Sequence, residues 1–272
     1  MRSALICILG MSLPAQGQLL YANGFFDPAA GGRVIYHVDV TSGQTTPWTV
    51  IKKPGLKEIT SMEVVRNSLY VSSGRLIVKI NMNTKHMRVI GRTGEQLWGG
   101  MAWDGETMWA TKNGSSLYTL DLNTADATFV KGITGRHSGL TFNKLDGRIY
   151  TASDTSQPQG HGIYSFNPKN LNALPVKLTG FPLGDTDVDS IAFDGVSKYY
   201  LVNEYNSTNP GTKVDGIYVY DTITKSYSFM NTIYPAGTQP GQTTLSGATF
   251  IPAPGTLGLL ALFGLGAARR TR

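Results

Sequence analysis

The chain has 272 residues, of which 41% are hydrophobic and 10% aromatic, so it can bury a core and is not expected to be disordered. Its formal charge is +6, but Arg2, Arg269, Arg270 and Arg272 lie in the terminal segments, and the other 20 basic residues face 18 acidic ones, which excludes nucleic acid as an expected partner. The single cysteine, Cys7, lies in the N-terminal apolar segment, which excludes disulfides and cysteine metal sites from the rest of the chain.

The first predicted element is a signal peptide over residues 1–17. Arg2 precedes an apolar run over residues 4–13, and small residues then stand at Ala15 and Gly17, in the pattern of a cleavage site. Cleavage is predicted after Gly17, with Ala15 as the alternative position. The other interpretation of the apolar run is a first buried strand or helix.

A five-residue pattern is repeated five times through the middle of the chain. It consists of an aliphatic residue, usually a tyrosine, any residue, an apolar residue and then Asp or Asn. The starts of the copies are 42, 40, 46 and 54 residues apart, close to the period of four-stranded propeller blades. The copies begin at Ile35, Ile77, Leu117, Ile163 and Ile217.

A second pattern, in which a small residue precedes two apolar residues separated by one position, has the same rhythm. Its copies begin at Ser61, Gly100, Gly139, Ser190 and Gly247. These segments are predicted to be the innermost strands, because a small residue fits where strands crowd toward a central channel. An aromatic strand follows each of the first four copies after a short polar turn, whereas the fifth copy has no such follower.

The missing follower of the fifth copy is found near the N-terminus, at Leu20, Tyr21 and Ala22. The sequence therefore predicts an all-β fold, a single five-bladed β-propeller over residues 18–250 that is closed by its N- and C-terminal strands. Such closure removes an exposed sheet edge. A β-sandwich is the alternative, but it gives no reason for a repeated four-strand unit. The repeats resemble those of propeller proteins, a resemblance that implies the fold and not the function.

Residues with catalytic potential are few. The histidines at 37, 86, 137 and 161 fall in different predicted blades without metal-ligand spacing, and no nucleophile elbow, P-loop or dinucleotide fingerprint is present. Glu63 occupies an unusual polar position in a predicted inner strand. We interpret it as a residue lining the channel, with catalysis as the alternative.

Three carboxylates alternate along one predicted loop, at Asp185, Asp187 and Asp189. Oxygen clusters of this kind select hard cations, so Ca²⁺ is the cofactor that this segment could bind. Ser190 and Val196, however, stand where a calcium loop has its glycine and its closing glutamate. A solvated loop that enters an inner strand is the other interpretation.

Loop lengths predict a ligand-binding face. With the strands of each blade numbered outward from the channel, connections from first to second and from third to fourth strand are mostly short. The other connections emerge on the opposite face and include the stretches 24–32, 154–161, 180–188, 204–215 and 234–244. Long loops on a rigid sheet commonly carry binding residues, although these loops could also be tolerated insertions. The predicted stacking residues are Phe25, Phe26, Tyr205 and Tyr234, and the predicted polar ones are His161, Asp185, Asp187 and Glu204.

The last predicted element is a sorting tail over residues 251–272. It places a proline motif (Pro252 and Pro254) before an apolar run that is too short for a self-sufficient membrane span, followed by a basic end that includes Arg269 and Arg270. This order resembles the PEP-CTERM sorting signal of Gram-negative bacteria, with an alanine where the family name has glutamate.

The resemblance implies a membrane-bound intermediate in the inner membrane, an exosortase-type membrane protease that removes the tail, and delivery to the cell surface or extracellular matrix. A plain C-terminal membrane anchor is the alternative.

The sequence favours an exported, noncatalytic binding protein whose ligand is an extracellular polysaccharide or a surface protein. One alternative is a propeller hydrolase or lactonase that uses a divalent metal in the central channel, held by Glu63, Asp189, Asn203 and Glu204. Another alternative is a structural part of a surface assembly. The binding protein is favoured because no catalytic motif is present.

Overall fold

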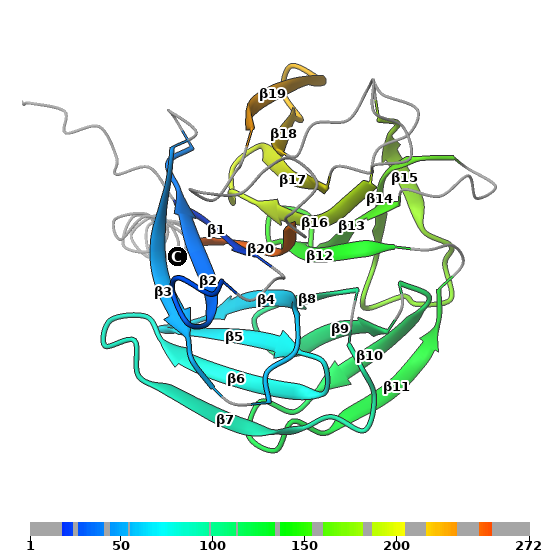
Figure 1. Cartoon of the computed structure of the whole chain (residues 1–272). Helices are drawn as coiled ribbons and strands as arrows, with labels where there is room; N and C mark the ends of the chain where they lie inside the picture. Colours follow the sequence, from blue (N-terminus) through cyan, green and yellow to red (C-terminus); the bar gives the residue numbers. More distant parts are fainter. Residues whose placement is uncertain are drawn as a thin grey trace, which may run out of the picture.

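The computed structural model describes residues 18–23, 27–40, 44–53, 55–97, 99–112, 114–133, 137–153, 160–181, 187–204, 216–232 and 245–251. In these ranges the chain forms five antiparallel four-stranded sheets, arranged as blades around a central axis (Figure 1). Among these residues, no helix is long and apolar enough to cross a membrane. The predicted signal peptide (1–17) and nearly all of the predicted tail lie outside the described residues.

The strands of each blade run outward from the axis. Blade 1 contains β20 (Leu245–Ile251), β1 (Gln18–Asn23), β2 (Arg33–Val38) and β3 (Thr45–Ile51). Blade 2 contains β4 (Ile59–Val65), β5 (Ser68–Ser73), β6 (Leu76–Asn81) and β7 (Met87–Arg92). Blade 3 contains β8 (Gly100–Trp103), β9 (Met108–Lys112), β10 (Ser116–Leu120) and β11 (Ala127–Gly132).

Blade 4 contains β12 (Ser138–Asn143), β13 (Arg148–Ser153), β14 (Gly162–Phe166) and β15 (Val176–Thr179). Blade 5 contains β16 (Asp187–Phe193), β17 (Lys198–Glu204), β18 (Gly216–Asp221) and β19 (Ser226–Thr232). The predicted five-bladed propeller is confirmed, and the five predicted inner segments are the innermost strands β4, β8, β12, β16 and β20.

Blade 1 closes the ring as predicted. Strand β20 pairs antiparallel with β1, from Gln18 opposite Ile251 to Asn23 opposite Leu245. The side chains of Leu19 and Leu20 are fully buried, on opposite faces of this sheet. The two ends of the described chain therefore share one sheet, so that the ring has no open edge between blades 1 and 5.

The repeated five-residue pattern is the third strand of each blade, and its last residue forms the turn to the fourth. The Asp121 carboxylate accepts hydrogen bonds from the backbone N–H groups of Asn123 (2.6 Å) and Thr124 (3.1 Å). Asn81 and Asp221 accept the equivalent pairs. A short side-chain acceptor at this position replaces backbone partners in the turn, which explains the recurring Asp or Asn.

Neighbouring inner strands approach so closely that their backbones touch. A Cβ atom added to Gly139, whose φ is +67°, would lie 2.5 Å from the backbone nitrogen of Ile191 and 2.7 Å from Cα of Ser190. One added to Gly100 would lie 2.3 Å from the backbone nitrogen of Leu140. The prediction of small residues at these positions is confirmed, because a side chain there would collide with the backbone of the next blade.

Polar side chains join the inner strands across blade boundaries. Oγ1 of Thr141 in β12 accepts a hydrogen bond from the backbone N–H of Phe193 in β16 (3.1 Å), and Oγ of Ser190 accepts one from that of Ala248 in β20 (2.7 Å). The inner edge of each sheet has no further strand to pair with, so these side chains satisfy amides that would otherwise be buried without a partner.

Each interface between neighbouring blades contains a hydrophobic cluster of its own. Between blades 4 and 5, Tyr199 is fully buried, and its hydroxyl accepts a hydrogen bond from the Asn143 amide (2.8 Å). Its ring lies 4.7 Å from that of Tyr150, whose pKa is raised to about 12, mainly by burial. Both phenols are therefore neutral structural groups at physiological pH.

Candidate functional site

The two faces of the disc differ in their connections. We use turn face for the side with the connections from first to second and from third to fourth strand, and loop face for the opposite side. Turn-face connections are short, as predicted, except that residues 167–175 join β14 to β15. On the loop face, blades 1, 4 and 5 have the long connections, whereas β5 and β6 of blade 2 are joined by Gly74 and Arg75 alone.

Most of the predicted binding residues lie outside the described residues: Phe25, Phe26, Asp185, Tyr205 and Tyr234. Their assignment to a ligand site therefore stays a prediction. The loops that contain them all start or end at the loop-face ends of described strands.

The remaining predicted residues lie in blades 4 and 5. His161 is partly buried just before β14, and its Nδ1 is buried without a hydrogen-bond partner. Asp187 and Glu204 face each other across the β16 and β17 pair, at its loop-face end. Asp189 lies two residues further into β16 and is partly buried. Asp187 and Glu204 are thus backbone partners in this strand pair, and their assignment to a ligand site stays a prediction.

The described residues include no group of three or more His, Cys, Asp or Glu side chains that could hold an ion. The side chains of Asn203 and Glu204, two of the four predicted channel ligands, lie outside what the structure describes, so the channel metal site stays a prediction. Glu63 belongs to β4 and Asp189 to β16, and these two inner strands are not neighbours in the ring. Glu63 occupies the position that Thr141 has in blade 4. Burial raises the pKa of Glu63 well above its ordinary value, against a smaller opposing effect of the Val64 backbone.

Replacing Glu63 by glutamine should stabilise the protein at neutral pH. The raised pKa means that the native state binds the proton more tightly than the unfolded state, so the stability of the wild type falls as pH rises above the ordinary carboxyl pKa. Glu63→Gln removes this loss. Thermal melts should show a higher midpoint for the variant at pH 7 and nearly equal midpoints at pH 3. Equal midpoints at both pH values would contradict a buried, desolvated carboxyl group.

Blade 2 carries a basic pocket on the loop face, beside the two-residue connection from β5 to β6. The pocket has a volume of about 330 Å³ and contains three exposed cations, Lys57, Arg75 and Arg92. They come from the connection before β4, the connection from β5 to β6, and the end of β7. No ion pair joins any of the three to a carboxylate within the part of the chain that the structure describes. The remaining lining residues are Gly55, Ser73, Leu76 and Gln96.

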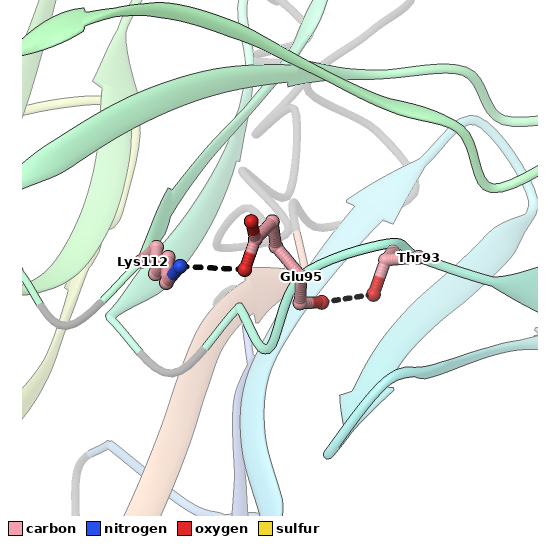
Figure 2. Close-up of polar contacts among 3 residues, drawn as sticks. All are labelled: Thr93, Glu95 and Lys112. Carbon is pink, nitrogen blue, oxygen red and sulfur yellow. Dashed lines mark hydrogen bonds and ion pairs between the residues drawn. The ribbon is translucent and has the colours of Figure 1, made fainter.

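An ion pair lies beside this pocket (Figure 2). The Nζ atom of Lys112 lies 2.5 Å from Oε2 of Glu95, and Thr93 Oγ1 donates a hydrogen bond to the Glu95 backbone carbonyl. The hydrogen bond from Lys112 lowers the pKa of Glu95, and Arg75 lowers it further through its charge. Glu95 is thus ionised at neutral pH, and its ion pair among the described residues is with Lys112 and not with one of the three pocket cations.

The turn face has a groove of about 720 Å³ between blades 2 and 3. Its walls include the aromatic side chains of Tyr70 and Trp103, and Lys79 Nζ lies 5.3 Å from the centre of the Tyr70 ring. Both signs of charge line it, with Arg66 and Lys79 facing three acidic residues. These acidic residues are Glu106, Asp121 and Asp126.

Sequence reasoning missed the basic pocket. Lys57, Arg75 and Arg92 are far apart in the sequence, and none of them lies in the long stretches of blades 1, 4 and 5 to which the argument from loop length pointed. The repeat contained a signal for this pocket. Residues beside the second-to-third-strand connection of a blade and beside the connections between blades must lie on the same face of the disc.

Comparisons with known proteins support the fold. No protein-family model matches the chain, and no curated protein matches it. Among solved structures, the chain is similar to one in the crystal structure of the nidogen/laminin complex, with a TM-score of 0.56, 16% identity, and coverage of 87% of this chain and 99% of the other. It is also similar to TolB from Acinetobacter baumannii, with a TM-score of 0.54, 16% identity, and coverage of 87% and 67%. At this identity both likenesses concern the fold alone, and they agree with a β-propeller.

Proposed function

We propose that the chain is an exported, noncatalytic binding protein that holds an extracellular polysaccharide or a surface protein on the loop face of its propeller. The basic pocket of blade 2 is the observation that carries this proposal. It offers three cations that form no ion pair with a carboxylate of the described residues, on the same face as the long connections of blades 1, 4 and 5.

The two ends of the chain supply the route in this proposal. The N-terminal segment (1–17) directs export, and the PEP-CTERM-like tail (251–272) holds the chain in the inner membrane until an exosortase-type protease removes it. The propeller then resides at the cell surface or in the extracellular matrix of a Gram-negative bacterium. Similarity of the tail to the sorting signal supports this route.

Fractionation of the parent bacterium tests both parts. The protein should be found in the surface or matrix fraction, without either terminal segment by mass spectrometry, and the purified chain should cosediment with isolated matrix polysaccharide or surface protein. Recovery of the full-length protein from the cytosol alone would contradict export. Failure to cosediment with any matrix or surface fraction would contradict the binding function.

A further inference from the structure

The pocket of blade 2 is held in place by buried contacts between the segments that form it. Oγ of Ser73 donates a hydrogen bond to the Lys57 carbonyl (2.7 Å), and the backbone N–H of Thr93 donates one to the Arg75 carbonyl (2.7 Å). Ser73 and Thr93 are both buried. The three segments that carry the cations are therefore joined to one another before any ligand arrives.

A second anchor fixes the connection from β7 to β8. Leu97 is fully buried, and its carbonyl accepts hydrogen bonds from the hydroxyls of Thr60 (3.0 Å) and Ser72 (3.1 Å). These bonds attach the segment that contains Gln96 to β4 and β5. A site whose backbone is already ordered loses little conformational entropy when it binds, so weak individual contacts can add up to a specific interaction.

The cations converge on one place. The stem of Lys57 lies against Gly74, where an added Cβ would be 3.3 Å from Lys57 Cδ, and Arg75 is the next residue. Arg92 lies opposite Leu76 in the β6 and β7 pair, and Leu76 follows Arg75 directly. Like charges this close repel one another, and an anion bound between them would attract each cation and offset that repulsion.

The lining also indicates the kind of anion. Ser73 and Gln96 are polar, and Leu76 is the one large apolar side chain in the lining. Protein interfaces usually centre on buried aromatic and apolar anchors, which this pocket lacks. Its volume of about 330 Å³ suits a small hydrophilic group, and guanidinium groups pair well with carboxylates and similar oxyanions.

We propose that this pocket binds an acidic sugar residue of an extracellular polysaccharide through its carboxylate or sulfate group, with Lys57, Arg75 and Arg92 as the binding cations. The inference rests on the proposed function and narrows its ligand to an acidic glycan. The Glu95–Lys112 ion pair lies beside the site, so the charge of Lys112 is balanced by Glu95 and does not add to that of the three pocket cations.

Titration of the full chain with an oligogalacturonide tests the assignment, with an oligodextran of equal length as the neutral probe. The variant Lys57→Gln/Arg75→Gln/Arg92→Gln should weaken oligogalacturonide binding about tenfold or more. The control Arg66→Gln/Lys79→Gln/Arg88→Gln removes the same charge from the same blade away from the pocket, and should change binding less than about twofold. Glu95→Gln should strengthen binding, because it removes a negative charge that interacts with Arg75.

Several results would overturn the assignment: no oligogalacturonide binding by the wild type, equal binding of oligodextran, or equal losses in the two triple variants. Dextran sulfate, added as a competitor, distinguishes sulfate from carboxylate recognition within the same proposal. A polyglutamate peptide that binds as tightly as the oligogalacturonide would assign the surface to an acidic protein instead. If the pocket variant still cosediments with matrix polysaccharide like the wild type, the proposed function stands and this inference fails.

Discussion

Replacing Gly139 by alanine should lower the free energy of unfolding by about 3 kcal/mol or more. The residue has a φ of +67°, which strains any side chain, and the new Cβ would lie 2.5 Å from a backbone nitrogen of the next inner strand. Backbone atoms cannot rotate away as a side chain can, so β12 and β16 would have to separate. Chemical denaturation of the variant and the wild type measures the difference.

Gly147 provides the matched control. It has nearly the same φ of +70° in the turn between β12 and β13, but an added Cβ would meet no atom within 4 Å. Gly147→Ala should therefore cost about 1 kcal/mol, the strain of the backbone conformation alone. The excess loss in Gly139→Ala reports the contact between inner strands. Equal losses in the two variants would show that the inner strands are not in backbone contact.

A chain that ends at residue 244 should not form a stable monomer. It lacks β20, which is the inner strand of blade 1. The backbone N–H of Ala248 in β20 donates a hydrogen bond to Oγ of Ser190 in blade 5. Loss of β20 would leave the inner edge of β1 unpaired. We expect loss of the cooperative thermal transition and soluble aggregates in size-exclusion chromatography.

A chain that ends at Ile251 is the control for that truncation. It keeps every residue of β20, including Ile251, which is also the first residue of the predicted tail, and it lacks the rest of that tail. Its melting temperature should match that of the longer chain, because closure of the ring depends on β20. A cooperative monomer from the chain that ends at residue 244, with the same melting temperature, would show that the ring does not need this closure.

The fold could be predicted because the repeats encode local requirements. Gly100 and Gly139 mark close approaches of the backbone, and the Asp or Asn after each third strand marks a turn, so both are readable without knowledge of distant neighbours. Closure was readable for the same reason, since one copy of the inner strand lacked its follower. Each of these signals lies within a few residues of the feature that it predicts.

The candidate site was harder to predict because it depends on residues from separate connections. Loop length directed attention to the residues around Tyr205 and Tyr234. Lys57, Arg75 and Arg92 belong to three separate segments whose convergence only the blade geometry reveals. Glu63 stood out in the sequence as an unexpected carboxylate. Its surroundings, and hence the direction of its pKa shift, follow from the packing of neighbouring inner strands.

Hydrogen–deuterium exchange of the full chain, with and without matrix polysaccharide from the parent bacterium, tests most directly the claim that the loop face binds the ligand. Protection should increase at residues 55–58, 73–76 and 92–97, which form the basic pocket. It should remain unchanged at residues 66–68, 105–107 and 121–126, which line the groove on the turn face. Protection confined to the turn-face segments would contradict the account and place the binding site in that groove.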